Sequence, residues 1–155
     1  MLPQNKFKIF KVTIISVHAP AEDKVYTVIS SLYGTLDRVC QTITEHDAVI
    51  VMGDMNAKVG DVSLTPYTGK YRLYKISNYN VVNLWDFLTC REFVTVCAMF
   101  QLKNIHLQTW ISPDWETFNQ IEHIMISRRY ASNNTDIRSL RSADCDSDHF
   151  MIIQT

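Results

Sequence analysis

The sequence predicts a mixed α/β domain built in layers. Two observations carry this prediction: a strand–helix–strand order in the first third of the chain, and a later series of short strands with few helices. The 155 residues, 46% of them hydrophobic and 20% charged, are enough for one domain with a substantial buried core. We therefore expect a single domain over residues 1–155.

The first three elements follow from local patterns. Residues 8–17, "KIFKVTIISV", are β-branched and aromatic enough to predict a strand, which Pro20 helps to end. Residues 48–52 are apolar on both faces and too short for a helix, so they predict a buried strand. Between them, apolar residues recur every three or four positions, which predicts an amphipathic helix, with Glu22 and Asp23 suited to its positive amino end. The apolar stripe consists of Val25, Val28, Ile29, Leu32, Leu36, Val39 and Ile43.

The rest of the chain predicts a loop, a short helix and a group of strands. Residues 60–79, which include Pro66 and Gly69, are expected to form a loop, and residues 80–90 a short helix. The polar segment 112–120, "SPDWETFNQ", predicts a hairpin-type turn. Strands are predicted at about 93–98, 107–111, 121–126, 136–141 and 149–153.

Charge and the amino-terminal segment limit the possible partners and compartments. The formal charge of −1 offers no overall attraction to a polyanion, so any contact with nucleic acid needs a local positive patch. Such a patch could form if Arg128, Arg129, Arg138 and Arg141 share a face, although a solvated surface is the alternative. Lysines at positions 6, 8 and 11 interrupt the apolar residues of the first segment, so it lacks the continuous apolar stretch of a signal peptide or a membrane span. We expect an intracellular protein, nuclear or cytoplasmic, that is neither secreted nor in a membrane.

The first candidate site is "GDMN", residues 53–56, at the end of the predicted strand 48–52. Asp54 and Asn56 are two residues apart, so an extended chain points both side chains the same way at the edge of a sheet, where open α/β folds bind ligands. A strand followed by a simple Asx-type turn is the competing interpretation.

The second candidate site is "ADCDSDHFMII", before the final predicted strand. Its three alternating aspartates suggest a calcium loop, but the glycine and the distal glutamate of such a loop are missing. Asp148 followed by His149 is better suited to phosphate chemistry, in which a carboxylate holds Mg²⁺ and an imidazole stabilises phosphoryl charge. An exposed acidic loop is the alternative.

The third candidate site is Glu122 in "NQIEHIMIS". On a strand, Glu122 shares a face with Ile124 and Ile126, and a carboxylate among apolar neighbours needs a partner, for which His149 is a natural choice. A glutamate at a strand edge that points into solvent is the alternative.

Four ordered motifs together resemble the endonuclease/exonuclease/phosphatase superfamily: "VHAP" (17–20), "GDMNAKVG" (53–60), "TWISPDWETFNQIEHI" (109–124) and "ADCDSDH" (143–149). Within that superfamily the chain is most similar to the craniofacial development protein 2-like group, relatives of endonucleases from non-LTR retrotransposons. The resemblance implies a two-sheet α/β sandwich of the DNase I-like type, Mg²⁺ (or Mn²⁺) as the cofactor and DNA as the partner.

The resemblance also implies roles for individual residues. Asp54 would position and deprotonate the attacking water, and Asn56 would contact the scissile phosphate. Asp148 would belong to the acidic cluster that binds the metal, and His149 would stabilise the developing phosphate charge. Glu122 would orient His149, at a position where the family usually has aspartate.

Three departures from the family pattern accompany these roles. Besides Glu122, His18 stands where many relatives have a tyrosine near the phosphate, and Ala21 stands where some have an asparagine. Family domains are also longer and supply a metal-binding glutamate from their first strands, and nothing before residue 17 resembles those strands. We therefore expect an N-terminally truncated domain with impaired cleavage of phosphodiester bonds.

Two other functions compete with the nuclease interpretation. One is a non-catalytic, retroelement-derived remnant or binding module. The other is a phosphatase of the same superfamily that acts on lipid or inositol phosphates, against which the nuclease-like "NQIEHI" and "DCDSDH" argue.

Overall fold

The structure is a computed structural model that describes residues 11–24, 26–61, 65–141 and 146–155. Residues 8–10 of the first predicted strand, Val25 of the helical stripe and Asp144 of the acidic segment lie outside this described part. In chain order the elements are β1 (Val12–His18), α1 (Tyr26–Gln41), β2 (Ala48–Asp54), α2 (Thr65–Thr68), α3 (Asn80–Arg91), β3 (Phe93–Thr95), α4 (Asn104–Leu107), β4 (Trp110–Ile111), β5 (Phe118–Asn119), β6 (Glu122–Ser127), the 3-10 helix η1 (Arg128–Asn133), β7 (Ile137–Leu140) and β8 (Met151–Gln154).

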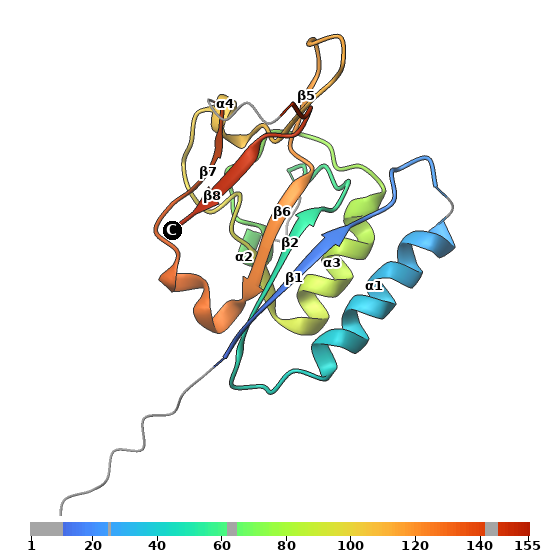
Figure 1. Cartoon of the computed structure of the whole chain (residues 1–155), viewed down its shortest axis with the longest axis vertical. Helices are drawn as coiled ribbons and strands as arrows, with labels where there is room; N and C mark the ends of the chain where they lie inside the picture. Colours follow the sequence, from blue (N-terminus) through green and yellow to red (C-terminus); the bar gives the residue numbers. More distant parts are fainter. Residues whose placement is uncertain (1–10, 25, 62–64, 142–145) are drawn as a thin grey trace, which may run out of the picture.

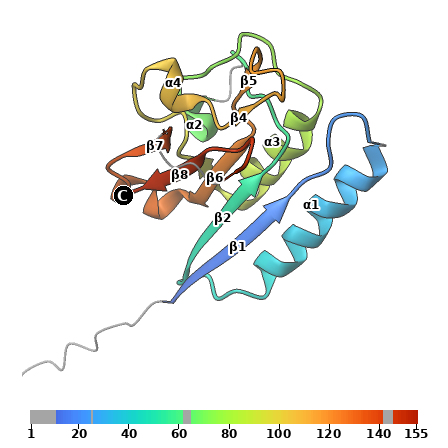
Figure 2. The same cartoon turned by 45° about the horizontal axis from the view of Figure 1, so that its top comes forward.

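A four-stranded sheet with the strand order β1-β2-β6-β3 forms the middle layer. β1 and β2 are parallel and are joined through α1, as a parallel pair requires, whereas β6 runs antiparallel to both β2 and β3. Figure 1 shows α1 and α3 side by side behind this sheet and the β7–β8 ribbon in front of it. Figure 2 shows the same arrangement with the β4–β5 hairpin brought forward.

Two apolar clusters hold the three layers together. Between the sheet and the helices, Val51 and Met125 of the strands pack against Leu84 and Leu88 of α3, and all four side chains are completely buried. On the other face of the sheet, Ile124 and Ile126 of β6 share a cluster with Val94, Ile137 and the partly buried Ile152. Successive residues of β6 therefore serve opposite layers, as the two-residue period of a strand requires.

The β7–β8 ribbon covers β3 and β6 but leaves the front face of β1 open. Ile15 and Val17 pack toward the helices, whereas the side chains of Val12 and Ile14 are 55% and 61% exposed. A hollow of about 660 Å³, lined in part by Ile50, separates the sheet from the ribbon.

The strongest sequence patterns predicted their elements correctly. The amphipathic stripe forms α1, the buried apolar run forms β2, and the segment from Asn80 forms α3. The predicted hairpin-type turn connects β4 to β5, which pair through Trp110 and Asn119. None of the helices in the described ranges is long and apolar enough to cross a membrane.

Three predicted strands are shorter or begin later than expected. Only the last two residues of the predicted strand 107–111 form a strand, β4, because the helical turn α4 ends only at Leu107. The predicted strand 93–98 ends at Thr95, where a turn closed by Met99 N–H on the Val96 carbonyl begins. The predicted strand 149–153 begins only at Met151.

Three helical segments of the described residues were not predicted. The loop 60–79 contains the four-residue helix α2, α4 precedes β4, and η1 follows β6 directly.

Candidate active site

Three strands bring the predicted site residues to one edge of the main sheet, here called the rim. β1 and β2 are parallel and end together, with His18 opposite Asp54. β6 is antiparallel to β2 and begins at the same edge, with Glu122 opposite Asp54. The rim therefore collects residues that are up to 104 positions apart in the sequence, from His18 to Glu122.

Gly53 allows β1 and β2 to approach closely just before the rim. Its φ is +136°, a conformation that residues with a side chain rarely adopt, and a Cβ at this position would lie 1.9 Å from the Val17 carbonyl oxygen.

Asp54 and Asn56 form one compact turn at the end of β2. Asp54 is 9% exposed, and its Oδ1 accepts a hydrogen bond from the Asn56 backbone N–H at 2.7 Å. The Asn56 side-chain Nδ2 donates to Asp54 Oδ2 at 3.2 Å and to the Ala19 carbonyl at 2.8 Å. The Asx-type turn that competed with the site interpretation is therefore present, and it is also what fixes the Asp54 carboxylate at the rim.

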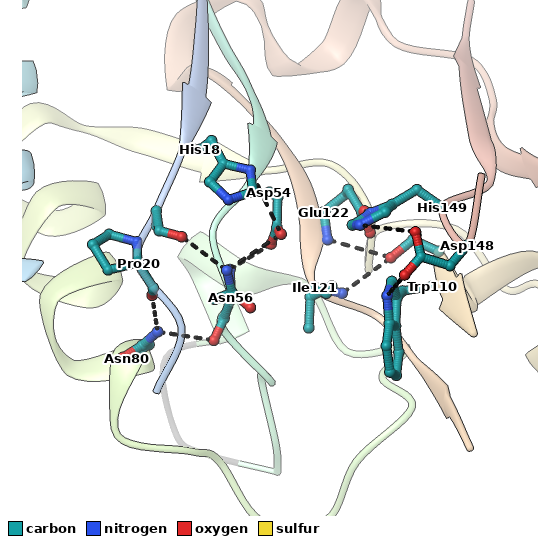
Figure 3. A network of polar contacts seen from close by, with 12 residues as sticks. His18, Pro20, Asp54, Asn56, Asn80, Trp110, Ile121, Glu122, Asp148 and His149 are labelled. Atoms are coloured by element: carbon teal, nitrogen blue, oxygen red, sulfur yellow. Dashed lines mark hydrogen bonds and ion pairs between the residues drawn. The ribbon is translucent and has the colours of Figure 1, made fainter. Parts of the chain in front are cut away.

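Asn80, at the start of α3, ties this turn to the loop after β1. Its side chain is completely buried, and its Nδ2 donates to the carbonyls of Asn56 and Pro20, both at 3.1 Å (Figure 3). Asn78 adds a second bond to the Asn56 carbonyl, at 2.9 Å from its Nδ2. Sequence reasoning missed both asparagines, because their partners lie 22 to 60 positions away in the sequence.

Replacing Asn80 with leucine should therefore destabilise the domain. The variant keeps the size of the side chain but leaves the Pro20 carbonyl without its donor and the Asn56 carbonyl with only the donor from Asn78, at a cost of about 1–3 kcal/mol in the free energy of unfolding. Urea denaturation measures the loss. Val82→Leu, at a partly exposed position of the same helix, is the control and should change stability by less than about 0.5 kcal/mol. A loss in Asn80→Leu no larger than in this control would contradict the clamping role.

Glu122 and His149 form a hydrogen-bonded pair beside Asp54. His149 Nδ1 donates to Glu122 Oε1, so the predicted partnership is confirmed. Glu122 is 9% exposed, and its burial raises the pKa of the carboxyl group, an effect that the neighbouring His149 opposes. Its second oxygen, Oε2, is buried without a hydrogen-bond partner among the described residues. Glu122 therefore is not the solvent-facing glutamate of the alternative interpretation.

Thr109 and Trp110 fix the segment that carries His149. The Thr109 carbonyl accepts the Phe150 N–H at 2.7 Å, and Trp110 forms an isolated β-bridge with His149. The Trp110 indole Nε1 donates to Asp148 Oδ2 at 2.8 Å, and Asp148 Oδ1 lies 3.8 Å from His149 Nε2 (Figure 3). Asp148 is thus held next to the pair, with half of its side chain exposed.

The rim opens into a groove of about 310 Å³. The groove is lined by Glu22, Asp54, Asn56, Lys58, Asn78, Trp110, Asn119, Ile121 and His149. Asn119 is fixed by the Tyr74 hydroxyl, which donates to Asn119 Oδ1 at 2.9 Å and accepts the Gln120 N–H at 2.7 Å. Burial raises the pKa of Tyr74 to about 12, so this hydroxyl remains a donor at neutral pH.

His18 and Ala21 are less engaged than the other predicted residues. The His18 side chain is 79% exposed, and its Nδ1 lies 4.0 Å from Asp54 Oδ2, so it stands at the border of the site. Ala21 is exposed and is not among the residues that line the groove.

The four arginines of the predicted positive patch do not line the groove. Arg128 and Arg141 lie over aromatic rings, the latter over both Phe118 and Phe150. Arg129 pairs with Glu45 at 3.6 Å and Arg138 with Asp136 at 3.6 Å. Each arginine therefore has its own local partner, and the structure does not support a shared patch at the site.

The donor set at the rim suits a small divalent cation. Asp54, Glu122 and His149 each offer one ligand atom, and these atoms lie within 4.8 Å of one another. Carboxylate oxygens are ligands that Mg²⁺ and Mn²⁺ accept readily. Because Glu122 and His149 are bound to each other, the carboxylates of Asp54 and Asp148 are the better candidates for holding the ion.

Comparison of the sequence with curated proteins identifies one set of relatives. Craniofacial development protein 2 of Tragulus javanicus is 31% identical over 146 residues, which are 94% of this chain and 25% of that protein. The protein of the same name from Bos taurus is 30% identical over 146 residues, which cover 94% of this chain and 24% of that protein. The chain thus spans about a quarter of the length of these relatives. No family model matches the sequence.

Comparison of the structure with solved structures identifies nucleases. The 3'-5' exonuclease NExo from Neisseria meningitidis has a TM-score of 0.57 at 18% identity and matches 91% of this chain and 59% of its own. A structure of the 3' phosphatase NExo bound to a product DNA hairpin gives the same values. The catalytic domain of Xenopus laevis APE2 has a TM-score of 0.58 at 18% identity, over 92% of this chain and 48% of its own. The chain is therefore similar to a quarter of craniofacial development protein 2 and has the DNase I-like α/β fold of these nucleases.

Proposed function

We propose that the groove hydrolyses phosphodiester bonds of DNA in a metal-dependent reaction. The observation that carries the proposal is the convergence of Asp54, Glu122 and His149, whose ligand atoms lie within 4.8 Å of one another at the rim. The fold shared with the 3'-5' exonuclease NExo, one structure of which contains a product DNA hairpin, supports DNA as the substrate.

Asp54 is our candidate for the residue that orients and deprotonates the attacking water. Both of its oxygens accept hydrogen bonds from Asn56, which fixes the carboxylate and leaves further lone pairs directed toward the groove. A fixed carboxylate in a largely buried position can hold the nucleophile in line with the phosphorus without further reorganisation.

Asn56 is better suited to position Asp54 than to contact the phosphate. The two hydrogens of its Nδ2 are directed at Ala19 and Asp54, so this amide has no free donor for a phosphate oxygen in the present conformation. We therefore assign Asn56 a positioning role, which differs from the phosphate contact that the family resemblance implies.

His149 is our candidate for stabilising the charge that develops on the phosphate. Its Nδ1 donates to Glu122, which fixes the orientation of the ring. The other nitrogen, Nε2, lies 3.8 Å from Asp148 Oδ1. A protonated imidazole can donate from this position to a phosphoryl oxygen.

A bound Mg²⁺ or Mn²⁺ would act as a Lewis acid on the phosphoryl oxygens. We assign Asp148 and Asp54 as its protein ligands, because Asp54 lines the groove, Asp148 Oδ1 lies 3.8 Å from His149 Nε2, and neither carboxylate is committed to His149 Nδ1. Two carboxylates bind Mg²⁺ weakly in water, so we expect slow cleavage that needs millimolar metal from the 155-residue chain.

Glu122→Gln should lower the nicking activity without lowering the stability of the fold. Glutamine keeps the size of the side chain and an acceptor for His149 but removes the negative charge that attracts the ring N–H, so the ring is held less firmly and metal-dependent nicking should fall by about 100-fold or more. The melting temperature should stay the same or rise. The folded state raises the pKa of Glu122, so its ionisation weakens the fold as the pH rises through that pKa, and glutamine removes this penalty.

Glu45→Gln is the matched control, because Glu45 is an exposed glutamate at the other end of β2, 84% exposed in its side chain. It should leave nicking unchanged. If Glu122→Gln cleaves as fast as the unmodified chain, the proposed role of the Glu122–His149 pair is wrong.

The competing functions predict different products in a side-by-side assay. The nuclease proposal predicts conversion of supercoiled plasmid to nicked circles with Mg²⁺ or Mn²⁺, and no release of phosphate from inositol phosphates. A phosphatase would show the reverse. A binding module would retain labelled DNA without cutting it at any metal concentration.

A further inference from the structure

Lys58 is the one lysine or arginine among the described residues that line the groove. The other charged groups there include the carboxylates of Glu22 and Asp54, which repel a phosphodiester substrate. A groove that takes a polyanion needs a cation to offset this repulsion. None of the four arginines predicted to supply it reaches the groove, so Lys58 is the residue in the right place.

The backbone of Lys58 is fixed by contacts on both of its polar groups. Its N–H donates to Asn78 Oδ1 at 2.9 Å, and its carbonyl accepts the Asn78 N–H at 3.2 Å. The flanking side chains of Ala57 and Val59 are buried at 0% and 6% exposure, and both belong to the core between the sheet and the helices. The Lys58 side chain therefore points the other way, into the groove, from an anchored position.

No ion pair joins Lys58 to a carboxylate of the described residues, although Glu22 and Asp54 line the same groove. The other basic residues near the sheet differ in this respect, because Arg91 pairs with Asp37 and Arg129 with Glu45. A partly buried ammonium group with an unneutralised charge is suited to bind an anion that arrives from solution.

We infer that Lys58 contacts a backbone phosphate of the bound nucleic acid and so positions the strand at Asp54. The inference rests on the proposed function, because it concerns the substrate of the same groove. A single phosphate contact contributes one released counterion, which corresponds to a slope of about 0.9 in a plot of log affinity against log salt concentration. Such a contact carries no sequence preference.

The test measures binding of a labelled DNA duplex in EDTA, where cleavage does not interfere, between about 50 and 200 mM salt. Lys58→Met keeps most of the apolar stem and removes the charge. It should weaken binding about eightfold near 0.1 M salt and reduce the salt slope by about 0.9. Lys58→Arg should restore both the affinity and the salt slope of the unmodified chain. If Lys58 acted only through packing of its apolar side-chain atoms, restoring the charge would not be expected to have this effect.

Lys11→Met is the control for net charge, because Lys11 is exposed and precedes β1 at the end of the sheet opposite the rim. It should leave affinity and slope unchanged. In the cleavage assay with metal, Lys58→Met should raise KM and leave kcat nearly constant, because the contact is the same in substrate and transition state.

The possible failures are distinguishable. If the unmodified chain nicks DNA but Lys58→Met binds with the same affinity and slope, the inference about Lys58 is overturned and the proposed function stands. If the unmodified chain neither binds nor nicks DNA, both are overturned. A loss of binding in Lys11→Met equal to that in Lys58→Met would also overturn the inference, because it would show an effect of net charge alone.

Discussion

Replacing Gly53 with alanine should remove about 4 kcal/mol or more of the free energy of unfolding, a large part of the roughly 5–15 kcal/mol that a domain of this kind has. Two effects add. The φ of +136° is strained for any residue with a side chain, and the new Cβ would lie 1.9 Å from the Val17 carbonyl oxygen. Relief of that contact requires β1 and β2 to separate at the rim, where the proposed catalytic residues lie.

Gly34→Ala is the control for this substitution. Gly34 lies in α1, and a Cβ added there meets no atom within 4 Å. Alanine favours a helix over glycine, so this variant should gain about 0.5–1 kcal/mol. Urea denaturation of both variants gives the comparison. A stability of Gly53→Ala within 1 kcal/mol of the unmodified chain would contradict the close approach of β1 and β2 described for the rim.

Asp54→Asn should reduce metal-dependent nicking by about 1,000-fold and leave the fold intact. Asparagine has the same size and still offers one oxygen to the Asn56 backbone N–H, which donates to Asp54 Oδ1 at 2.7 Å. It cannot accept a proton from water, and it is a weaker ligand for Mg²⁺, so both proposed contributions of Asp54 are lost together.

Asp47→Asn is the control for Asp54→Asn, because Asp47 precedes β2 at the end opposite the rim. It accepts the Lys11 backbone N–H at 2.9 Å, a bond that asparagine can also make. Its nicking rate should equal that of the unmodified chain. Equal activity in Asp54→Asn and Asp47→Asn would show that the cleavage does not depend on the rim.

Local patterns in the sequence were enough to predict the elements that build the rim. The stripe of α1 and the apolar run of β2 depend on neighbours within a few residues, and such patterns are the most reliable signal in a single sequence. The ordered motifs then named Asp54, Glu122 and His149, and the structure brings these three side chains together. The DNase I-like fold implied by the same motifs is confirmed by the solved structures that the chain matches.

The contacts that support the site could not be predicted, because they join distant segments. Asn80 reaches Pro20 across 60 positions, and Trp110 reaches Asp148 across 38. A single sequence contains no signal for such pairs. Lys58 was likewise passed over, because one lysine after "GDMNA" looks like any solvated surface charge until the buried neighbours on both sides show which way it points.

The sequence left open whether the four arginines form a shared patch, for a related reason. Position along a strand shows which face an arginine occupies, but it does not show whether an aromatic ring or a carboxylate is already in contact with it. Arg141 lies over two rings, and Arg129 pairs with Glu45. Local partners of this kind decide whether a positive charge is available to a ligand.

The central claim is that the rim is a metal-dependent phosphodiesterase site, and one measurement tests it most directly. The purified 155-residue chain is incubated with supercoiled plasmid over a range of Mg²⁺ or Mn²⁺ concentrations, beside a double variant carrying Asp54→Ala and His149→Ala. The account predicts slow nicking that rises with millimolar metal, stops in EDTA and is lost in the double variant. Absence of nicking at every metal concentration, or nicking that the double variant retains, would contradict it.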